Sequence, residues 1–182
     1  TDGAPLAQID DAGVSLGLAV TPDGRYVISA SFDSTLKVWD WASSNSGRGR
    51  PAHQLPVWSI AVTLDGRYVI SASFDKTLKV WDWATGELVR TLEGHTALVT
   101  GVAVTPDGHY AISASADKML KVWDWATGEL VRTLEVHTNA VFDVAVTPDG
   151  RYAISASFDK TLKVWDWATG ELVRTLEGHT AA

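Results

Sequence analysis

A repeat of 42 residues constrains this chain more than any other feature of its sequence. The stretch over residues 65–96 returns over 149–180 with one change in 32 residues. A third, slightly altered copy covers 107–138, and a partial copy covers 23–42. Self-similarity at a fixed period of this length is typical of a repeat architecture. The 182 residues are therefore expected to form one array rather than two ordinary domains.

Each full copy has the pattern of four short strands. In the third copy, an apolar run over 99–104 ends at Thr105-Pro106-Asp107-Gly108, a turn in which proline presets φ and glycine tolerates the bend. The runs 110–115 and 120–125 follow, and 129–135 alternates apolar and polar residues as a half-exposed outer strand does. Four antiparallel strands in each repeat make one propeller blade. The predicted blades cover 14–50, 56–93, 98–135 and 140–177.

Two segments depart from the repeat. Residues 1–13 match it poorly, and we interpret them as an outer-strand or closure segment. Residues 43–51 (SSNSGRGRP) stand where the other copies have an outer strand. Serine, glycine and proline lower strand propensity and raise flexibility, so a flexible loop or a poorly paired edge is expected there.

The repeated motifs resemble those of the tryptophan–aspartate (WD) repeat family of β-propellers. In the third copy they are Gly94-His95, the turn at 104–108, the segment 113–117 and Trp123-Asp124. The near-identical copies look like a recently amplified bacterial propeller or a fragment of one. The resemblance implies an all-β fold of four-stranded antiparallel blades, four in each chain.

Four blades raise the question of how the array closes. An open arc would expose two apolar faces and unpaired strand edges. Several tryptophans in each blade would crowd a ring of four, whereas two chains related by a two-fold axis form a ring of eight. We therefore expect an eight-bladed homodimer, with a closed four-bladed monomer as the alternative. Either residues 1–13 or residues 170–179 would supply the closing outer strand.

The family resemblance also implies a hydrogen-bonded tetrad in each blade, with histidine held between serine and aspartate and donating onward to an indole. The first repeat lacks its own histidine, and His179 keeps the 42-residue step but has no blade after it, so we expect His179 to lie across the seam between chains. The tetrad residues are His53, Ser71, Asp75 and Trp81; His95, Ser113, Asp117 and Trp123; His137, Ser155, Asp159 and Trp165; and Ser29, Asp33 and Trp39 with His179.

A hydrolase reading of the same residues is less favoured. A Ser-His-Asp set can act as a catalytic triad, but catalysis needs one exposed nucleophile beside an oxyanion pocket, and three equivalent sets inside sheets offer none. We therefore predict no catalytic residue and no enzymatic activity.

Variable positions point to a binding face instead. The near-identical copies differ mainly at the positions just after the histidine and just before the tetrad aspartate. The family resemblance implies that both sets of positions lie on one face of the propeller. Aromatic residues there would act as binding anchors, or they would simply pack against neighbouring loops. The candidate positions are Leu16, Trp58, Thr100 and Phe142, with Phe32, Phe74 and Phe158.

Composition excludes several classes of function. A net charge of −7 argues against a nucleic-acid or anionic-membrane surface. There is no cysteine for a disulfide or thiol chemistry. The five histidines are spread along the repeats, so no metal site or cofactor is predicted. The apolar runs are strand-sized, and no signal peptide is visible in a sequence that begins with Thr1, although a removed signal would leave the same trace. We expect a cytoplasmic piece of a longer protein.

The leading interpretation is a protein-interaction scaffold, the C-terminal sensor or adaptor part of a larger bacterial protein. Its partners would be a second copy of the chain and a peptide or protein on the propeller face. The alternative is a purely structural, self-assembling module, natural or engineered, whose only partner is itself.

Overall fold

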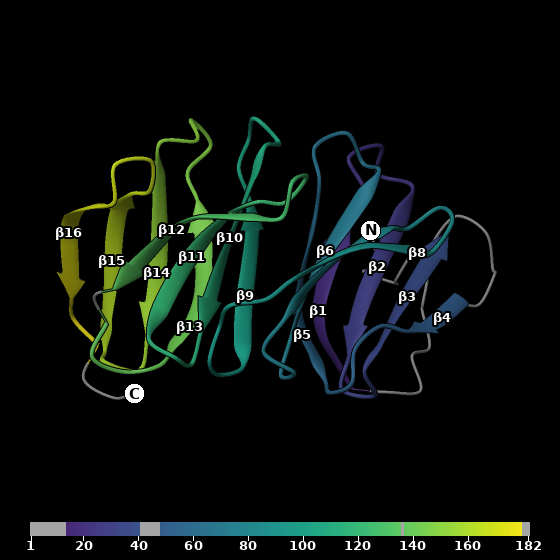
Figure 1. The fold of residues 1–182 in the computed structure, drawn as a ribbon, viewed down its shortest axis with the longest axis horizontal. Helices are drawn as coiled ribbons and strands as arrows, with labels where there is room; N and C mark the ends of the chain where they lie inside the picture. The colour runs from purple at the N-terminus through teal and green to yellow at the C-terminus, as the bar shows by residue number, and fades with distance from the viewer. Residues whose placement is uncertain (1–13, 41–47, 136, 180–182) are drawn as a thin grey trace, which may run out of the picture.

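The computed structural model of the chain describes residues 14–40, 48–135 and 137–179, and all regular structure in these ranges is β-strand. Sixteen strands form four sheets that follow one another along the chain (Figure 1). The strands are β1 (Ser15–Val20), β2 (Tyr26–Ser31), β3 (Thr35–Asp40), β4 (Arg48–Pro51), β5 (Val57–Val62), β6 (Tyr68–Ser73), β7 (Leu78–Asp82), β8 (Glu87–Leu92), β9 (Val99–Val104), β10 (Tyr110–Ser115), β11 (Met119–Asp124), β12 (Glu129–Glu135), β13 (Val141–Val146), β14 (Tyr152–Ser157), β15 (Thr161–Asp166) and β16 (Glu171–Glu177).

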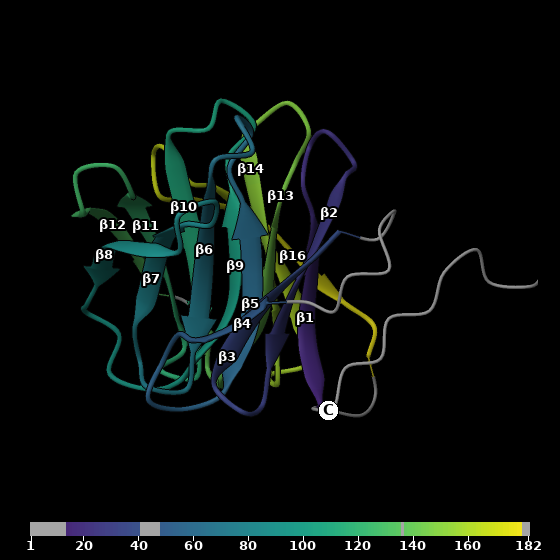
Figure 2. The ribbon, with the colours of Figure 1, turned by 90° about the vertical axis from the view of Figure 1, so that its right-hand side faces the viewer.

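Each sheet has four antiparallel strands in chain order, so the predicted all-β fold with four blades is confirmed. The first strand of each sheet lies beside the first strand of the next, in the series β1, β5, β9 and β13. Figure 2 shows the outer strands β8 and β12 on one side of the molecule, with β5, β9 and β13 toward its middle.

The first sheet corrects one expectation. Residues 48–51 form strand β4, whose Pro51 lies opposite Thr35 and whose Arg48 lies opposite Val38. Of the two alternatives, the flexible loop is wrong for these four residues and the edge strand holds, because the free edge of β3 offers backbone partners that outweigh their low strand propensity. The rest of that loop, 43–47, and the closure segment, 1–13, lie outside the described residues.

Two kinds of turn join the strands within a sheet. In the third sheet, the Gly108 N–H donates to the Thr105 carbonyl at 2.8 Å, and Gly108 has a φ of +77°. The following turn places Lys118 at a φ of +75°, and its N–H donates to the Ser115 carbonyl at 3.1 Å. Glycine, in the first turn, is the residue type that a positive φ favours, whereas lysine, in the second turn, is not.

Three apolar cores hold successive sheets together, and all three have the same design. Residues from strands two to four of one sheet pack against the first three strands of the next. Between the second and third sheets the core consists of Ile70, Ala72, Leu78, Val80, Leu92, Val99, Val102, Ala111 and Trp123. Burial of these side chains is the main favourable contribution to the array.

The array is open at both ends. Figure 1 shows the first and fourth sheets at opposite ends of the molecule, and in the described strands β13 does not pack beside β1 as the other first strands pack beside each other. Leu18 of the first sheet is 68% exposed, whereas its equivalent Val102 is 6% exposed. A single chain therefore forms an open series of blades and not a closed ring of four.

Candidate functional site

A β-bulge opens the first strand of every sheet. In the second sheet Val57 pairs with Ser73 and Ser59 pairs with Ala72, which leaves Trp58 as the extra residue. The other three first strands carry the same register shift at the equivalent position. A bulge bends the strand and redirects the side chain of the unpaired residue, and bulges are common beside functional sites. The four bulged residues are Leu16, Trp58, Thr100 and Phe142.

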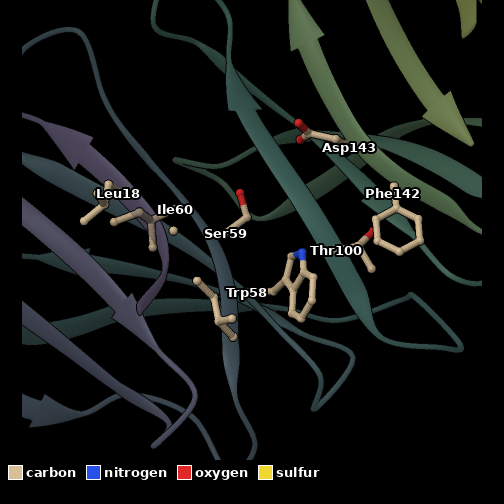
Figure 3. Close-up of a pocket in the computed structure, with 9 residues that line it drawn as sticks. Leu18, Trp58, Ser59, Ile60, Thr100, Phe142 and Asp143 are labelled. Carbon is tan, nitrogen blue, oxygen red and sulfur yellow. The ribbon is translucent and has the colours of Figure 1, made fainter. Parts of the chain in front are cut away.

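These four residues line one hollow of about 230 Å³ where the first strands converge. Figure 3 shows the rings of Trp58 and Phe142 with the Thr100 side chain between them, on three successive first strands. Asp143 carries the one carboxylate of this hollow. The structure thus brings together four candidate binding residues that are 42 positions apart in the sequence.

The candidate phenylalanines lie beside two of the bulged residues. Phe74 stacks on Trp58 with 5.1 Å between ring centroids, and Phe158 meets Phe142 edge-on at 4.2 Å. Phe142 and Phe158 nevertheless remain 36% and 41% exposed, and Phe32 is 56% exposed. The aromatic set therefore packs within the second and fourth blades and still presents apolar surface to the exterior.

Thr100 has a structural role that its equivalents do not share. It is buried, and its hydroxyl Oγ1 lies 2.7 Å from the Val141 carbonyl of the fourth sheet. Beside it, Gly101 is closely approached by the next strand, since a Cβ on Gly101 would lie 2.9 Å from Asp143 Oδ1. Part of the variation between repeats is thus explained by packing between neighbouring blades.

The tetrad residues come together in the second, third and fourth sheets. In the third, His95 Nδ1 lies 2.7 Å from Asp117 Oδ2 and His95 Nε2 lies 2.8 Å from Ser113 Oγ. The Trp123 indole N–H donates to the same serine oxygen at 2.9 Å. The other two sheets repeat this geometry with distances of 2.7–3.0 Å.

The direction of the last hydrogen bond corrects the sequence interpretation. An indole nitrogen has a proton to give and no lone pair to accept one, so the tryptophan donates into the network. The order is aspartate, histidine, serine, tryptophan, and the histidine does not contact the indole nitrogen through a hydrogen bond of its own in the described sheets.

Burial sets the protonation of these groups. The pKa of the His53 imidazole lies below its usual value because burial disfavours the charged ring, which outweighs the nearby Asp75 carboxylate. Burial also opposes ionisation of Asp75, but hydrogen bonds from Thr77 and His53 together lower the pKa of its carboxyl. In the second sheet, a neutral His53 therefore donates from Nδ1 to an ionised Asp75 and accepts at Nε2 from the Ser71 hydroxyl.

The arrangement has the connectivity of a catalytic triad without its accessibility. Ser71, Ser113 and Ser155 are fully buried, and each hydroxyl oxygen already accepts an indole N–H. A nucleophile must reach its substrate and have donors for the developing oxyanion. Chemically, these networks can satisfy buried polar groups and fix loops, but their serines cannot attack a substrate from inside the sheets.

The residues expected to form a fourth tetrad, Ser29, Asp33, Trp39 and His179, are not all brought together by the described part of the chain. The Trp39 indole donates to Ser29 at 2.9 Å, as in the other sheets. The Asp33 side chain is 46% exposed and lies 3.9 Å from Lys37 Nζ. His179 is exposed after β16, and no residue in the described ranges hydrogen-bonds to its ring. The chain alone therefore does not bring His179 to the first sheet.

Within residues 14–40, 48–135 and 137–179, no group of three or more histidine or acidic residues is arranged to hold a metal ion. The described part of the chain has no helix long and apolar enough to cross a membrane.

Comparison with known families agrees with this geometry. The model of the WD domain, G-beta repeat, matches residues 7–40 and 128–166. The model of the first beta-propeller of WD repeat-containing protein 75 matches residues 61–136. No curated protein matches the chain. The two models overlap over residues 128–136 and together cover 7–40 and 61–166, and both describe blades of the kind that the four sheets form. The chain belongs to the WD-repeat β-propeller family.

Proposed function

We propose that this chain is a non-enzymatic scaffold that binds a peptide or protein segment at the bulged ends of its first strands. Propellers of the WD-repeat family generally act as protein-interaction scaffolds and are typically not enzymes. The observation that carries the proposal is the hollow in which Trp58 and Phe142 flank Thr100 (Figure 3). Aromatic anchors that keep part of their surface exposed suit an apolar side chain of a partner.

The negative charge of the hollow and of the chain favours one class of binding partner. Asp143 lies in the hollow, its Oδ1 accepts the Val144 N–H at 2.9 Å, and the chain carries a net charge of −7. A basic residue next to an apolar anchor would therefore be favoured over an acidic one. The expected partner is an extended segment with an apolar side chain seated between Trp58 and Phe142 and a lysine or arginine beside Asp143.

The test is selection from a peptide library on the wild-type chain, followed by binding measurements on two matched variants. The double variant Trp58→Ala/Phe142→Ala should bind the selected peptides at least about tenfold more weakly, as loss of two hot-spot rings predicts. Leu88→Ala/Leu130→Ala, on exposed outer strands, should bind them as the wild type does. Equal binding by both variants would refute the site. A collapse of the melting temperature in the first variant would show that its rings serve packing.

A second candidate function, self-assembly without any other ligand, is favoured by the apolar faces at the two ends of the array. Val14, Leu18 and Val20 are 57–68% exposed at one end, and Leu176 is 41% exposed at the other. Exposed apolar patches of this kind mark interaction surfaces. Libraries that yield no specific peptide, together with a stable homodimer in solution, would favour this second function over the first.

A further inference from the structure

Two neighbouring loops carry the aromatic residues beside the hollow in the second sheet. Residues 53–58 lead into β5 and include Trp58, and the turn 74–77 between β6 and β7 includes Phe74. The two rings stack at 5.1 Å between centroids, with 19° between their planes. Phe74 thus supports one face of the Trp58 ring. The position of Trp58 in the hollow therefore depends on how the two loops are held together.

Asp75 joins these two loops. Its Oδ2 accepts from His53 Nδ1 at 2.8 Å and from the Gln54 N–H at 3.2 Å, so two consecutive residues of one loop bind one carboxylate oxygen of the other. The His53 side chain is fully buried and that of Asp75 is 11% exposed, which limits competition from water. Beside Asp75, the Phe74 N–H donates to the Pro56 carbonyl at 3.0 Å. The His53–Asp75 pair thus fixes the loops from which both rings project.

The fourth sheet repeats this arrangement around Phe142, the other aromatic residue of the hollow. His137 Nδ1 lies 2.7 Å from Asp159 Oδ2, and both side chains are buried. Phe158 precedes Asp159, and its N–H donates to the Ala140 carbonyl at 3.0 Å. The Phe158 ring meets Phe142 edge-on at 4.2 Å. Each aromatic residue of the hollow is therefore supported by a ring on a loop that a buried histidine–aspartate pair holds.

The third sheet has the same hydrogen bonds around different residues. His95 Nδ1 lies 2.7 Å from Asp117 Oδ2, and both side chains are buried. Thr100 and Ala116 stand where the second and fourth sheets have aromatic residues. Thr100 is held by its own hydrogen bond to the Val141 carbonyl at 2.7 Å. The third sheet thus separates the tetrad from the ring pair within one chain.

We propose that His53 and His137 are positioning residues of the binding site. Through Asp75 and Asp159, each holds the ring pair that flanks one side of the hollow. Loss of either histidine would let the two loops move apart, and the ring in the hollow would no longer have one fixed direction. A binding partner would then have to order that ring, which weakens binding. This inference rests on the peptide-binding function proposed above and assigns it two further residues.

The first experiment follows the rings directly and needs no peptide. The chain has four phenylalanines, so labelling with 4-fluorophenylalanine gives four fluorine NMR signals, which single leucine substitutions assign. His53→Gln should shift or broaden the Phe74 signal and leave the Phe158 signal in place, and His137→Gln should do the reverse. His95→Gln is the matched control and should leave both signals in place. Signals that stay unchanged in their own variants, or that move in the control, would overturn the proposal.

Stability is measured alongside, because all three substitutions remove a buried histidine. The three variants should lower the melting temperature alike, since the three tetrads have the same geometry. A structural role would be equal in the three sheets, whereas a positioning role is confined to the second and fourth. Should a histidine variant fail to fold, the milder variants Asp75→Asn, Asp159→Asn and Asp117→Asn take the place of the three histidine variants, because asparagine keeps one oxygen acceptor.

The second experiment measures affinity for the peptides selected from the library. His53→Gln and His137→Gln should each raise the dissociation constant about three- to tenfold, the cost of ordering one side chain on binding. His95→Gln should raise it less than twofold. Unchanged affinity in the first two variants, or equal weakening in all three, would overturn the proposal. A library that yields no peptide would refute the proposed function instead, and the fluorine signals alone would then decide whether the two histidines position the rings.

Discussion

The third sheet and the first sheet contain nearly the same residues in different surroundings. In both, the tryptophan indole donates to the serine hydroxyl at 2.9 Å. In the third sheet, Asp117 is 5% exposed and lies 2.7 Å from His95. In the first, Asp33 is 46% exposed and lies 3.9 Å from Lys37. The tryptophan–serine bond is thus common to both sheets, and the burial of the aspartate is not.

This difference shows that a single blade forms the tryptophan–serine hydrogen bond by itself, whereas burial of the aspartate requires a neighbouring blade. Strand register alone places the tryptophan near the serine, because Ala111 pairs with Trp123 and Ser113 pairs with Lys121, as Val27 pairs with Trp39 and Ser29 with Lys37. The histidine comes from the segment after the preceding outer strand. The histidine excludes water from the aspartate and connects two blades, so its contribution to stability depends on the array and not on one blade.

The largest expected effect comes from removing that histidine in the middle of the array. His95→Ala deprives buried Ser113 and Asp117 of a partner, and we expect a loss of about 2–4 kcal/mol in the free energy of unfolding. Urea denaturation measures it. The control His109→Ala should change the free energy by less than about 0.5 kcal/mol, as exposed substitutions do. Equal losses in the two variants would contradict a role for His95 in joining blades.

The two aspartates should respond differently to the same substitution. Asp117→Asn removes the charge that accepts from His95 and leaves a buried amide, which we expect to cost about 1–3 kcal/mol. Asp33→Asn removes an exposed ion pair with Lys37 and should cost less than about 1 kcal/mol. Denaturation of both variants at a concentration where the chain is monomeric makes the comparison. A larger loss for Asp33→Asn would show that the first sheet already has a buried aspartate partner.

Acid should weaken the tetrad of the second sheet in two steps. Burial lowers the pKa of His53 in the folded chain, so the unfolded chain binds a proton first, and stability is lost as pH falls below about 6.5. The pKa of Asp75 is also lowered, so its contribution is lost only below about pH 4. Melting temperatures between pH 7 and 5 should fall less in His53→Gln than in the wild type. The same slope in both would exclude His53 as the group that titrates.

Much of the fold could be predicted from the sequence because the determinants are local and recur. The turn at 105–108, the alternation over 129–135 and the position of Trp123 each define one part of a blade, and the period repeats them. The tetrads follow from the same register. Strand β4 could be predicted only as one of two alternatives, because its residues have low strand propensity and pair only where the edge of β3 is available.

The candidate site was only partly visible in the sequence. Variation marked Trp58 and Phe142, which the structure places in one hollow, but the β-bulges that direct these side chains leave no distinct residue signal. The sequence also gave no sign that Thr100 hydrogen-bonds across to the next sheet. Both features depend on how neighbouring first strands approach one another, which is a property of the assembled array.

The smallest predicted effect concerns a feature that the first and third sheets share. Ser34 and Lys118 occupy the same turn position with φ of +69° and +75°, a region that costs residues other than glycine about 1–2 kcal/mol. Glycine removes that cost but makes the unfolded chain more flexible, so Ser34→Gly and Lys118→Gly should each stabilise the chain by about 0.5 kcal/mol. Because this turn lies within one sheet, the two gains should be equal in urea denaturation, whereas substitutions at Asp33 and Asp117 should differ. A gain at Lys118 alone would mean that neighbouring blades also shape the turn, and that the division between blade and array is less sharp than the tetrads indicate.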